Sequence, residues 1–285
     1  MPELAEAEFF RKRWHQAAVG QRVANVLLHD RAKVFRKTDA KTVLSSLKGA
    51  RYLNSEAATK QILFQFQKKS VGERRPSGVV WLGVHLGMSG ELRVGSPDYT
   101  PQRHDHLVLQ IKRSALIFSD TRMFGRVQVH VGSDAPGWWT HIAPPIVSAA
   151  FTVEAVGAFL KRRARAPIKA VMLMQERFPG IGNWMADEIL WRAAIHPRRL
   201  AGSLRPAEVR RLWIECRRVC RLALATIAGR GDDLPLDLNV RIPDTWLFNH
   251  RWEPGGRCPK TKQPLARAEI GGRTTCWSPA RQKYR

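Results

Sequence analysis

The spacing of apolar residues changes once along this chain, and that change constrains the fold more than any other feature. Between about residues 21 and 131 the pattern is mostly β-like, and Ile62, Phe64 and Phe66 alternate with polar neighbours. Further strand candidates are 79–86, 106–111 and 115–119. After about residue 151 the spacing becomes helical. The chain therefore predicts an α+β protein with a β-rich first part and a helical second part.

Four segments follow from this change of period. A helix over 3–18 followed by antiparallel strands predicts a β-sandwich domain over 1–135. The Pro-containing segment 136–150 is typical of a linker. We expect a helical domain over 151–240, and a C-terminal β-hairpin over 241–285, which is rich in Gly, Pro, Arg and Trp.

The helical part contains four helix candidates. Their ranges are 152–162, 167–177, 184–195 and 206–228. The last of them opens with Pro206, which suits the first position of a helix. Its apolar stripe includes Cys216 and Cys220, so we expect both thiols in the core rather than on a metal. In the first part, the polar segment 68–78 predicts an exposed hairpin loop.

Charge narrows the classes of function. Lys and Arg number 48 against 24 Asp and Glu, which gives a formal net charge of +24, and both halves of the chain are basic. Such a field attracts a polyanion, and nucleic acid is the commonest one. No run approaches the roughly 18 apolar residues of a membrane span, the acidic N-terminal segment is no export signal, and four cysteines form no disulfide scaffold. We expect a cytoplasmic, nucleoid-associated protein with a nucleic-acid partner and no membrane.

The first residues carry a possible nucleophile. A small second residue favours removal of Met1, which would leave Pro2 with a free secondary amine. An α-amino group with a pKa of about 8 is partly unprotonated at neutral pH and can form a Schiff base with a sugar carbon. Glu3 could transfer the accompanying protons. Proline in a first helical turn also has a purely structural explanation, so other motifs must decide.

Five motifs, spread from residue 2 to residue 282, supply that decision. They read PELAEAE, HLGMSG, DTRMFG, GIGNWMADE and GGRTTCWSPARQ, and begin at residues 2, 85, 120, 180 and 271. In this order they resemble the formamidopyrimidine-DNA glycosylase/endonuclease VIII family, whose motifs read PELPEVE, HLGMSG, DPRRFG, GIGNIYADE and GGRSTHFCPRCQ. The resemblance implies a catalytic β-sandwich, a helix–two-turns–helix DNA-binding domain and a C-terminal finger.

The resemblance also implies a catalytic set. Pro2 would attack the sugar of a damaged nucleotide, Glu3 would transfer protons, and Glu6 would support the site. The family's catalytic lysine has two alignments here. Arg51-Tyr52-Leu53 resembles the family's GKYL and would replace the lysine by arginine. Alternatively, TKQILFQF matches GKxLLFxF and keeps the upstream Leu-x-Gly, which makes Lys60 the lysine.

We prefer Lys60 because this register also keeps the strand alternation after the lysine. A solvated lysine at the start of a strand remains the other interpretation. Thr59 stands where the family usually has glycine, which reduces backbone freedom.

Residues in the two central motifs match positions that contact DNA in the family. Met88, Arg122 and Phe124 correspond to side chains that fill the gap left by an extruded nucleotide. Extruding a base costs a few kcal/mol, and an inserted apolar or planar side chain recovers part of that cost. Met123 replaces the family's second arginine, and His85 is a further candidate for a backbone contact.

Two residues of the second part match phosphate-binding positions. Asn183 follows a Gly-Ile-Gly turn at the start of a predicted helix, where backbone N–H groups and the helix dipole favour a phosphate. Asn183 could equally act as an N-cap. Arg273, at a predicted hairpin tip, matches the finger arginine that grips phosphates in the family.

The finger departs most from the family. Relatives commonly hold it with four cysteines around one Zn²⁺. Here the four positions are Cys258, Thr261, Ser278 and Arg281. We therefore expect a zincless finger and no cofactor or metal. It would be held by hairpin pairing and by the packing of Trp252, Leu265 and Trp277.

The resemblance implies a bifunctional DNA glycosylase/AP lyase, monomeric, that acts on double-stranded DNA with damaged bases or abasic sites. Oxidised purines such as 8-oxoguanine and formamidopyrimidines are the first expectation. The loop 229–248 is shorter than the family's lesion-covering loop and unlike it, so oxidised pyrimidines or hydantoins are alternatives. A non-catalytic damaged-DNA-binding relative is a second hypothesis. A protein associated with RNA or the ribosome is a third, but it does not explain the N-terminal motifs.

Overall fold

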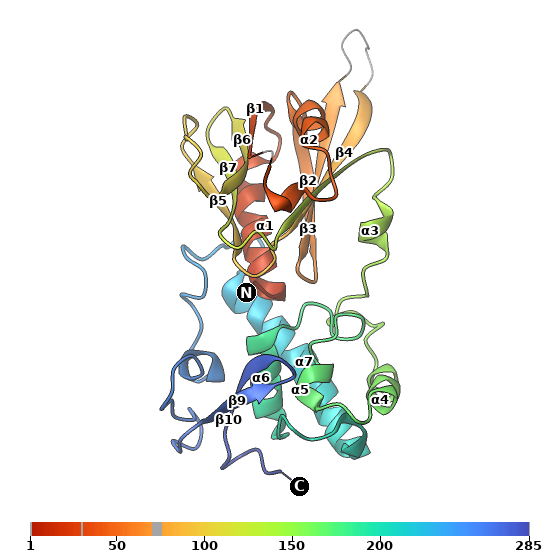
Figure 1. Cartoon of the computed structure of the whole chain (residues 1–285), viewed down its shortest axis with the longest axis vertical. Helices are drawn as coiled ribbons and strands as arrows, with labels where there is room; N and C mark the ends of the chain where they lie inside the picture. The colour runs from red at the N-terminus through yellow and green to blue at the C-terminus, as the bar shows by residue number, and fades with distance from the viewer. Residues whose placement is uncertain (1, 30, 70–75, 285) are drawn as a thin grey trace. The chain divides into compact units, whose positions relative to one another are not determined.

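A computed structural model describes residues 2–29, 31–69 and 76–284. The chain forms two compact units (Figure 1). The first contains Pro2 and Glu6–Ile142, and the second contains Glu3–Ala5 and the chain from Ala143 onward. Helix α1 (Leu4–Ala18) therefore begins in the second unit and continues in the first.

The first unit contains two four-stranded sheets, in which every neighbouring pair of strands is antiparallel. One sheet has the order β1-β6-β7-β5, from β1 (Val23–Leu28), β6 (Asp105–Ile111), β7 (Ala115–Asp120) and β5 (Gly90–Gly95). The other has the order β2-β3-β4-β8, from β2 (Arg51–Ala58), β3 (Gln61–Lys69), β4 (Pro76–His85) and β8 (Arg126–Val131). The short helices are η1 (Lys33–Phe35), α2 (Ala40–Leu47) and α3 (Gly137–Thr140).

Helix α1 connects the two sheets through Trp14, which is fully buried. Its ring packs on Phe64 of β3 with centroids 5.0 Å apart, and its indole Nε1 donates to the carbonyl oxygen of Arg93 in β5 at 3.0 Å. The alternating residues Ile62 and Phe66 are buried with Phe64. The antiparallel strands expected from this alternation are therefore confirmed.

The second unit is helical and ends in a hairpin. Its helices are α4 (Val153–Arg162), α5 (Ile168–Val171), α6 (Asn183–Ala193), η2 (Ala201–Ser203), α7 (Pro206–Ile227) and η3 (Leu247–His250). Strands β9 (Ala266–Ile270) and β10 (Arg273–Trp277) pair antiparallel across a Gly-Gly turn. Cys216 and Cys220 are buried and free, as the stripe of α7 predicted. The predicted α+β class is confirmed.

Two expectations need correction. The helix expected over 167–177 is only the single turn α5, because after Met172 the backbone N–H groups of Leu173 and Met174 bond to carbonyl oxygens three residues back rather than four. The side chain of Gln175 bonds the turn that follows: its Nε2 donates to the carbonyl oxygens of Leu173 and Ile181, and its Oε1 accepts from the backbone N–H of Gly180. The expected loop 68–78 lies partly outside the described residues, and its described ends belong to strands β3 and β4.

Among the residues that the structure describes, no helix combines the length and the apolar character needed to cross a membrane.

Candidate active site and nucleic-acid interface

The carboxylate of Glu3 lies at the N-terminal end of helix α6, within the second unit. It accepts hydrogen bonds from the backbone N–H groups of Gly182 at 2.9 Å, Trp184 at 2.9 Å and Met185 at 3.2 Å. The next residue is fixed as well, because the N–H of Leu4 donates to the carbonyl oxygen of Gly180 at 3.0 Å. Unpaired N–H groups and the positive end of the helix dipole stabilise a negative charge at this position. Glu3 is thus an immobilised carboxylate, 1% exposed.

Glycine at position 182 makes this contact possible. A Cβ atom added to Gly182 would lie 2.3 Å from Cδ of Glu3 and 2.4 Å from its Oε1. Real Cβ contacts do not reach such distances, so any side chain there would displace the carboxylate. The Gly-Ile-Gly turn therefore serves the position of Glu3.

Asn183 differs from what the sequence predicted. The N-cap of α6 is Gly182 and Asn183 is the first helical residue, so the expected alternative of an Asn183 N-cap is wrong. Three of the N–H groups expected to meet a phosphate are used by Glu3. Instead, Nδ2 of Asn183 donates to the carbonyl oxygen of Thr274 in β10 at 2.8 Å. Its Oδ1 has no hydrogen-bond partner among the described residues.

Pro2 and Glu6 flank Glu3 in sequence and belong to the first unit. Both are buried, and Glu6 is 4% exposed in the first turn of α1. The structure thus describes the residue that would carry the amine and the two acidic residues named with it.

Lys60 lies in the two-residue turn between β2 and β3, whereas Arg51 begins β2 at the opposite end of that strand. The guanidinium Nε of Arg51 donates to the carbonyl oxygen of Gly20 at 3.0 Å. Thr59, which precedes Lys60, has φ +62° and is 8% exposed. A β-branched residue in this left-handed region is strained, and glycine would not be.

His85 ends β4 and pairs with Gln61, the residue after Lys60. Burial, together with the positive charges of Arg126, Lys60 and Arg36, lowers the pKa of His85 to about 4. The ring is therefore neutral at pH 7. Its Nδ1 accepts from the backbone N–H of Gly87 at 3.0 Å, so Nε2 carries the proton and is available as a donor.

The two central motifs form adjoining loops organised by Asp120. Its Oδ1 accepts from Oγ of Ser89 at 2.5 Å and from the N–H of Arg122 at 3.2 Å, while its Oδ2 accepts from the N–H of Gly125 at 2.6 Å. The loops approach so closely that a Cβ on Gly87, where φ is +63°, would lie 2.4 Å from the nitrogen of Gly125. One buried carboxylate thus holds both loops.

The side chains expected to enter a base stack lie on these loops. Phe124 is 51% exposed, and the guanidinium carbon of Arg122 lies 4.9 Å from the centre of its ring. Met88 is half-buried on the neighbouring loop. Met123 adopts φ +53°, another left-handed residue. The structure therefore brings Met88, Arg122 and Phe124 onto one pair of loops.

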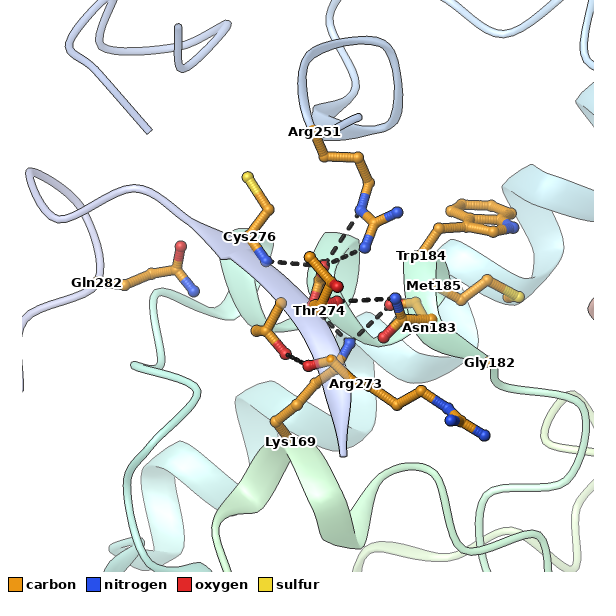
Figure 2. Close-up of polar contacts among 12 residues, drawn as sticks. Lys169, Gly182, Asn183, Trp184, Met185, Arg251, Arg273, Thr274, Cys276 and Gln282 are labelled. Atoms are coloured by element: carbon orange, nitrogen blue, oxygen red, sulfur yellow. Dashed lines mark hydrogen bonds and ion pairs between the residues drawn. The ribbon is translucent and has the colours of Figure 1, made fainter. Parts of the chain in front are cut away.

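A buried charge network joins α6 to the finger hairpin (Figure 2). The carboxylate of Asp187 accepts from Lys169 Nζ at 2.5 Å, from Arg251 Nη2 at 2.6 Å and from the N–H of Cys276 at 3.0 Å. Lys169 also donates to the carbonyl oxygen of Asn183 at 2.7 Å. Arg273, three residues after Ile270, points away from this network and is exposed.

Comparison with known proteins identifies the family to which a chain with this geometry belongs. The model of the formamidopyrimidine-DNA glycosylase N-terminal domain matches residues 1–127, and that of the H2TH domain of the same enzyme matches residues 142–231. The formamidopyrimidine-DNA glycosylase of Thermus thermophilus is 33% identical over 99% of this chain and 98% of its own length. The chain belongs to the formamidopyrimidine-DNA glycosylase family.

Solved structures agree in fold. A Lactococcus lactis glycosylase of this family, in complex with DNA that contains an abasic site, has a TM-score of 0.81 and is 21% identical, covering 99% of this chain and all of its own. The same enzyme with DNA that contains an oxidised pyrimidine has a TM-score of 0.82 and is 22% identical over the same shares. Membership in this family makes the chain a DNA glycosylase of the base-excision repair type.

The finger positions of this family member do not fit a zinc ion. They hold one thiol, two hydroxyls and a guanidinium, whereas structural zinc takes four thiolate or imidazole ligands. Among the described residues, no group of three or more His, Cys, Asp and Glu side chains is placed to hold a metal. Burial raises the pKa of the Cys258 thiol, but hydrogen bonds from Thr261, Ser278 and Trp191 lower it to about 7.

Packing of the finger differs in part from the expectation. Leu265 packs on a buried cluster that contains Trp191, Leu247, Cys258 and Cys276. The ring of Trp277 meets that of His196 edge-on at 5.3 Å. Trp252, which was expected to pack inside, is 49% exposed. Its ring meets that of Phe248 edge-on, with the ring centres 5.1 Å apart.

Sequence reasoning missed the network of Lys169, Asp187 and Arg251. Asp187 belongs to the motif GIGNWMADE, and Lys169 interrupts an apolar stretch, IKAVML. A charged residue within such a stretch is a signal for a buried ion pair, but nothing in the sequence identifies its partner.

Proposed function

We propose that this chain is a bifunctional DNA glycosylase and abasic-site lyase that excises oxidised bases through the amine of Pro2. The observation that carries the proposal is the position of Glu3. Its carboxylate is fixed by three backbone N–H groups, one residue after the proposed nucleophile. Such immobilisation is expected of a group that must meet a reacting atom in one geometry.

The chemistry follows from an amine and a carboxylate that are adjacent in the chain. Once Met1 is removed, the amine of Pro2, with an ordinary α-amino pKa of about 8, is partly unprotonated at neutral pH. Its lone pair attacks C1′ of the damaged nucleotide, the bond from C1′ to the base breaks, and the base leaves with a proton. Cleavage of the C1′–O4′ bond opens the sugar and leaves a Schiff base on Pro2. Loss of a proton from C2′ then expels the 3′ phosphate and cuts the strand.

Each of these steps needs a proton carrier, and the chain supplies them without a cofactor. We assign to Glu3, whose carboxylate is held at the end of α6, the transfer of a proton from the amine and its return to the opening sugar. Glu6, buried in the first turn of α1, supports this site. Lys60 is the cation that we assign to the lesion, since it lies half-buried in a turn of the sheet, close enough to His85 for its charge to lower the pKa of that ring.

Duplex DNA that contains a damaged base or an abasic site is the proposed partner, bound by a monomer. Met88, Arg122 and Phe124 fill the gap left by the extruded nucleotide, as their loop positions permit. Asn183, Arg273 and the protonated Nε2 of His85 contact phosphates. The relatives are bacterial, and we place this activity in the cytoplasm at the nucleoid.

Oxidised purines, such as 8-oxoguanine and formamidopyrimidines, are the substrates that we propose first, because the central motifs are those of that branch. The lesion-covering loop supports a second candidate class. Leu236 is 88% exposed and Val240 is 64% exposed in this loop, which therefore offers apolar side chains to a ligand. The Lactococcus lactis enzyme was crystallised in complex with DNA that contains an oxidised pyrimidine. Oxidised pyrimidines or hydantoins are therefore the alternative substrates that we propose for this chain.

Borohydride trapping tests the proposal. The wild-type protein, incubated with duplex DNA that contains an abasic site and then reduced, should form a covalent adduct that migrates as one protein on one strand. Pro2→Gly should bind the same duplex with an affinity within about threefold, since it removes no charge, but should lose most excision. Edman sequencing should find Pro2 as the first residue.

A non-catalytic damage-binding protein is the other candidate, and strain at Thr59 and the replacement at Met123 are the observations in its favour. It predicts tight binding with no trapped adduct for the wild-type protein. An adduct and an excision rate that both persist unchanged in Pro2→Gly would show that the secondary amine of proline is not required and would contradict the proposed role of Pro2.

A further inference from the structure

The finger hairpin lies against helix α6 within the second unit, and two side-chain clusters hold it there. The first is the buried carboxylate of Asp187, near the middle of α6. It accepts two hydrogen bonds from Arg251, at 3.1 Å and 2.6 Å, and one from the backbone N–H of Cys276 in β10. The side chains of Asp187 and Lys169 are 0% exposed and that of Arg251 is 4% exposed. This cluster joins β10 and the segment before the finger to one helical residue.

The second cluster lies at the C-terminal end of α6, where carbonyl groups lack helical partners. Arg281 donates from Nε to the carbonyl oxygen of Trp191 at 2.7 Å and from Nη2 to that of Arg192 at 2.8 Å. The neighbouring Gln282 donates to the carbonyl oxygen of Ile195 at 2.9 Å. A cation at this end of a helix is also favoured by the dipole. The residue that stands at a cysteine position of the family thus acts as a helix cap.

The remaining thiol is satisfied by protein donors. Sγ of Cys258 accepts from the indole Nε1 of Trp191 at 3.3 Å and from the backbone N–H of Thr261 at 3.4 Å. Cys258 is 0% exposed and packs in the same apolar cluster as Cys276. A metal would have to displace these donors and enter beside the guanidinium of Arg281, whose charge opposes a cation.

We propose that this finger folds without a metal, and that Asp187 and Arg281 perform the attachment that zinc performs in relatives. The two contacts lie one helical turn apart on α6, so they fix β10 in both position and orientation. Asn183 donates to the carbonyl oxygen of Thr274 in β10, and Arg273 is the neighbouring residue. Asp187 is therefore a positioning residue for both proposed phosphate contacts. This inference concerns the finger and does not depend on the nucleophile proposed above.

Metal analysis of the full-length protein, purified without chelators, is the first test. We expect zinc well below one equivalent, and no change in melting temperature or in affinity for an abasic-site duplex after incubation with 1,10-phenanthroline. Stoichiometric zinc that is lost in Cys258→Ser, or a melting temperature that falls with the chelator, would overturn the proposal.

Variants test the attachment. Arg281→Ala should weaken binding of the abasic-site duplex by about tenfold, because the finger loses its cap as well as one charge. Arg267→Ala is the matched control, since it removes the same charge from an exposed position on β9; we expect a loss of about twofold. Equal effects of the two variants would show that Arg281 acts only through its charge and would contradict the proposal.

Asp187→Asn and Asp187→Glu separate positioning from folding. The Asn variant keeps the size of the side chain but leaves Lys169 and Arg251 without an anion. If Asp187 positions the phosphate contacts, Asp187→Asn should show a smaller salt dependence of DNA binding, because fewer phosphates are contacted, and Asp187→Glu should partly restore it. A salt dependence equal to that of the wild-type protein would contradict the positioning role. If the Asn variant does not fold, the chelator and Arg281 experiments decide alone.

Discussion

Glu3 occupies the space that a side chain at position 182 would need. Its Cδ lies 2.3 Å from the Cβ position of Gly182, and its carboxylate is bonded to the N–H of that same residue at 2.9 Å. Two residues 179 positions apart in sequence, with nearly all of the first unit between them, thus depend on each other. The Gly-Ile-Gly turn and the acidic residue after Pro2 are parts of one structure.

Gly182→Ala should therefore slow base excision, although residue 182 is not one of the proposed DNA contacts. The added methyl group displaces the Glu3 carboxylate, and a shift of about 1 Å in a catalytic group can cost about 100-fold in rate. Single-turnover excision from an oxidised-base duplex measures the effect. Gly157→Ala is the control, because a Cβ there lies 3.8 Å from Val209, an ordinary contact. Wild-type excision by Gly182→Ala would mean that Glu3 does not need this position.

Lys60→Ala and Arg51→Ala decide which residue is the catalytic cation. The two residues lie at opposite ends of β2, so they cannot both reach one lesion. We expect about a 100-fold slower excision for Lys60→Ala, the lower end of the range for loss of a proton-transfer group, and a change within about twofold for Arg51→Ala. Each variant removes one positive charge, so each controls for the other. The reverse result would restore the alignment that places arginine at the family's lysine position.

His85 should make the first unit sensitive to mild acid. Its pKa is about 4 in the folded protein and about 6.5 in the unfolded chain, so between these values the unfolded chain binds a proton that the folded chain does not. As far as His85 is concerned, the free energy of unfolding is highest above about pH 6.5. It falls as the pH decreases towards about 4 and is constant below that.

Urea unfolding at about pH 7 and about pH 5 measures this dependence. The wild-type protein should lose about 1–2 kcal/mol more than His85→Gln between these conditions. An identical pH dependence in the two proteins would show that His85 is protonated without cost in the fold.

Most of the fold could be predicted from the sequence because local patterns report local structure. The alternation at Ile62, Phe64 and Phe66 predicted β3, and the stripe around Cys216 and Cys220 predicted α7. The length of α5 could not be predicted, because the apolar spacing of residues 168–174 continues beyond the single turn that the chain forms.

The sequence proposed which residues form the site but not how they are arranged. Glu3 was recognised by its place after Pro2, yet its partners begin at residue 182, and no local pattern links them. Asp187 and Lys169 are charged residues of types that usually lie on the surface. Only the tertiary structure shows that they are paired and buried. Trp252 was expected inside because it is large and apolar, but Trp191 fills the interior of the finger from α6.

Helix α6 has only eleven residues, and three separate sets of contacts depend on it. Its first turn holds the carboxylate of Glu3, its middle bonds to β10 through Asp187, and its last turn accepts hydrogen bonds from Arg281. A substitution that tilts this short helix would therefore disturb the proposed catalytic carboxylate and the proposed phosphate contacts together.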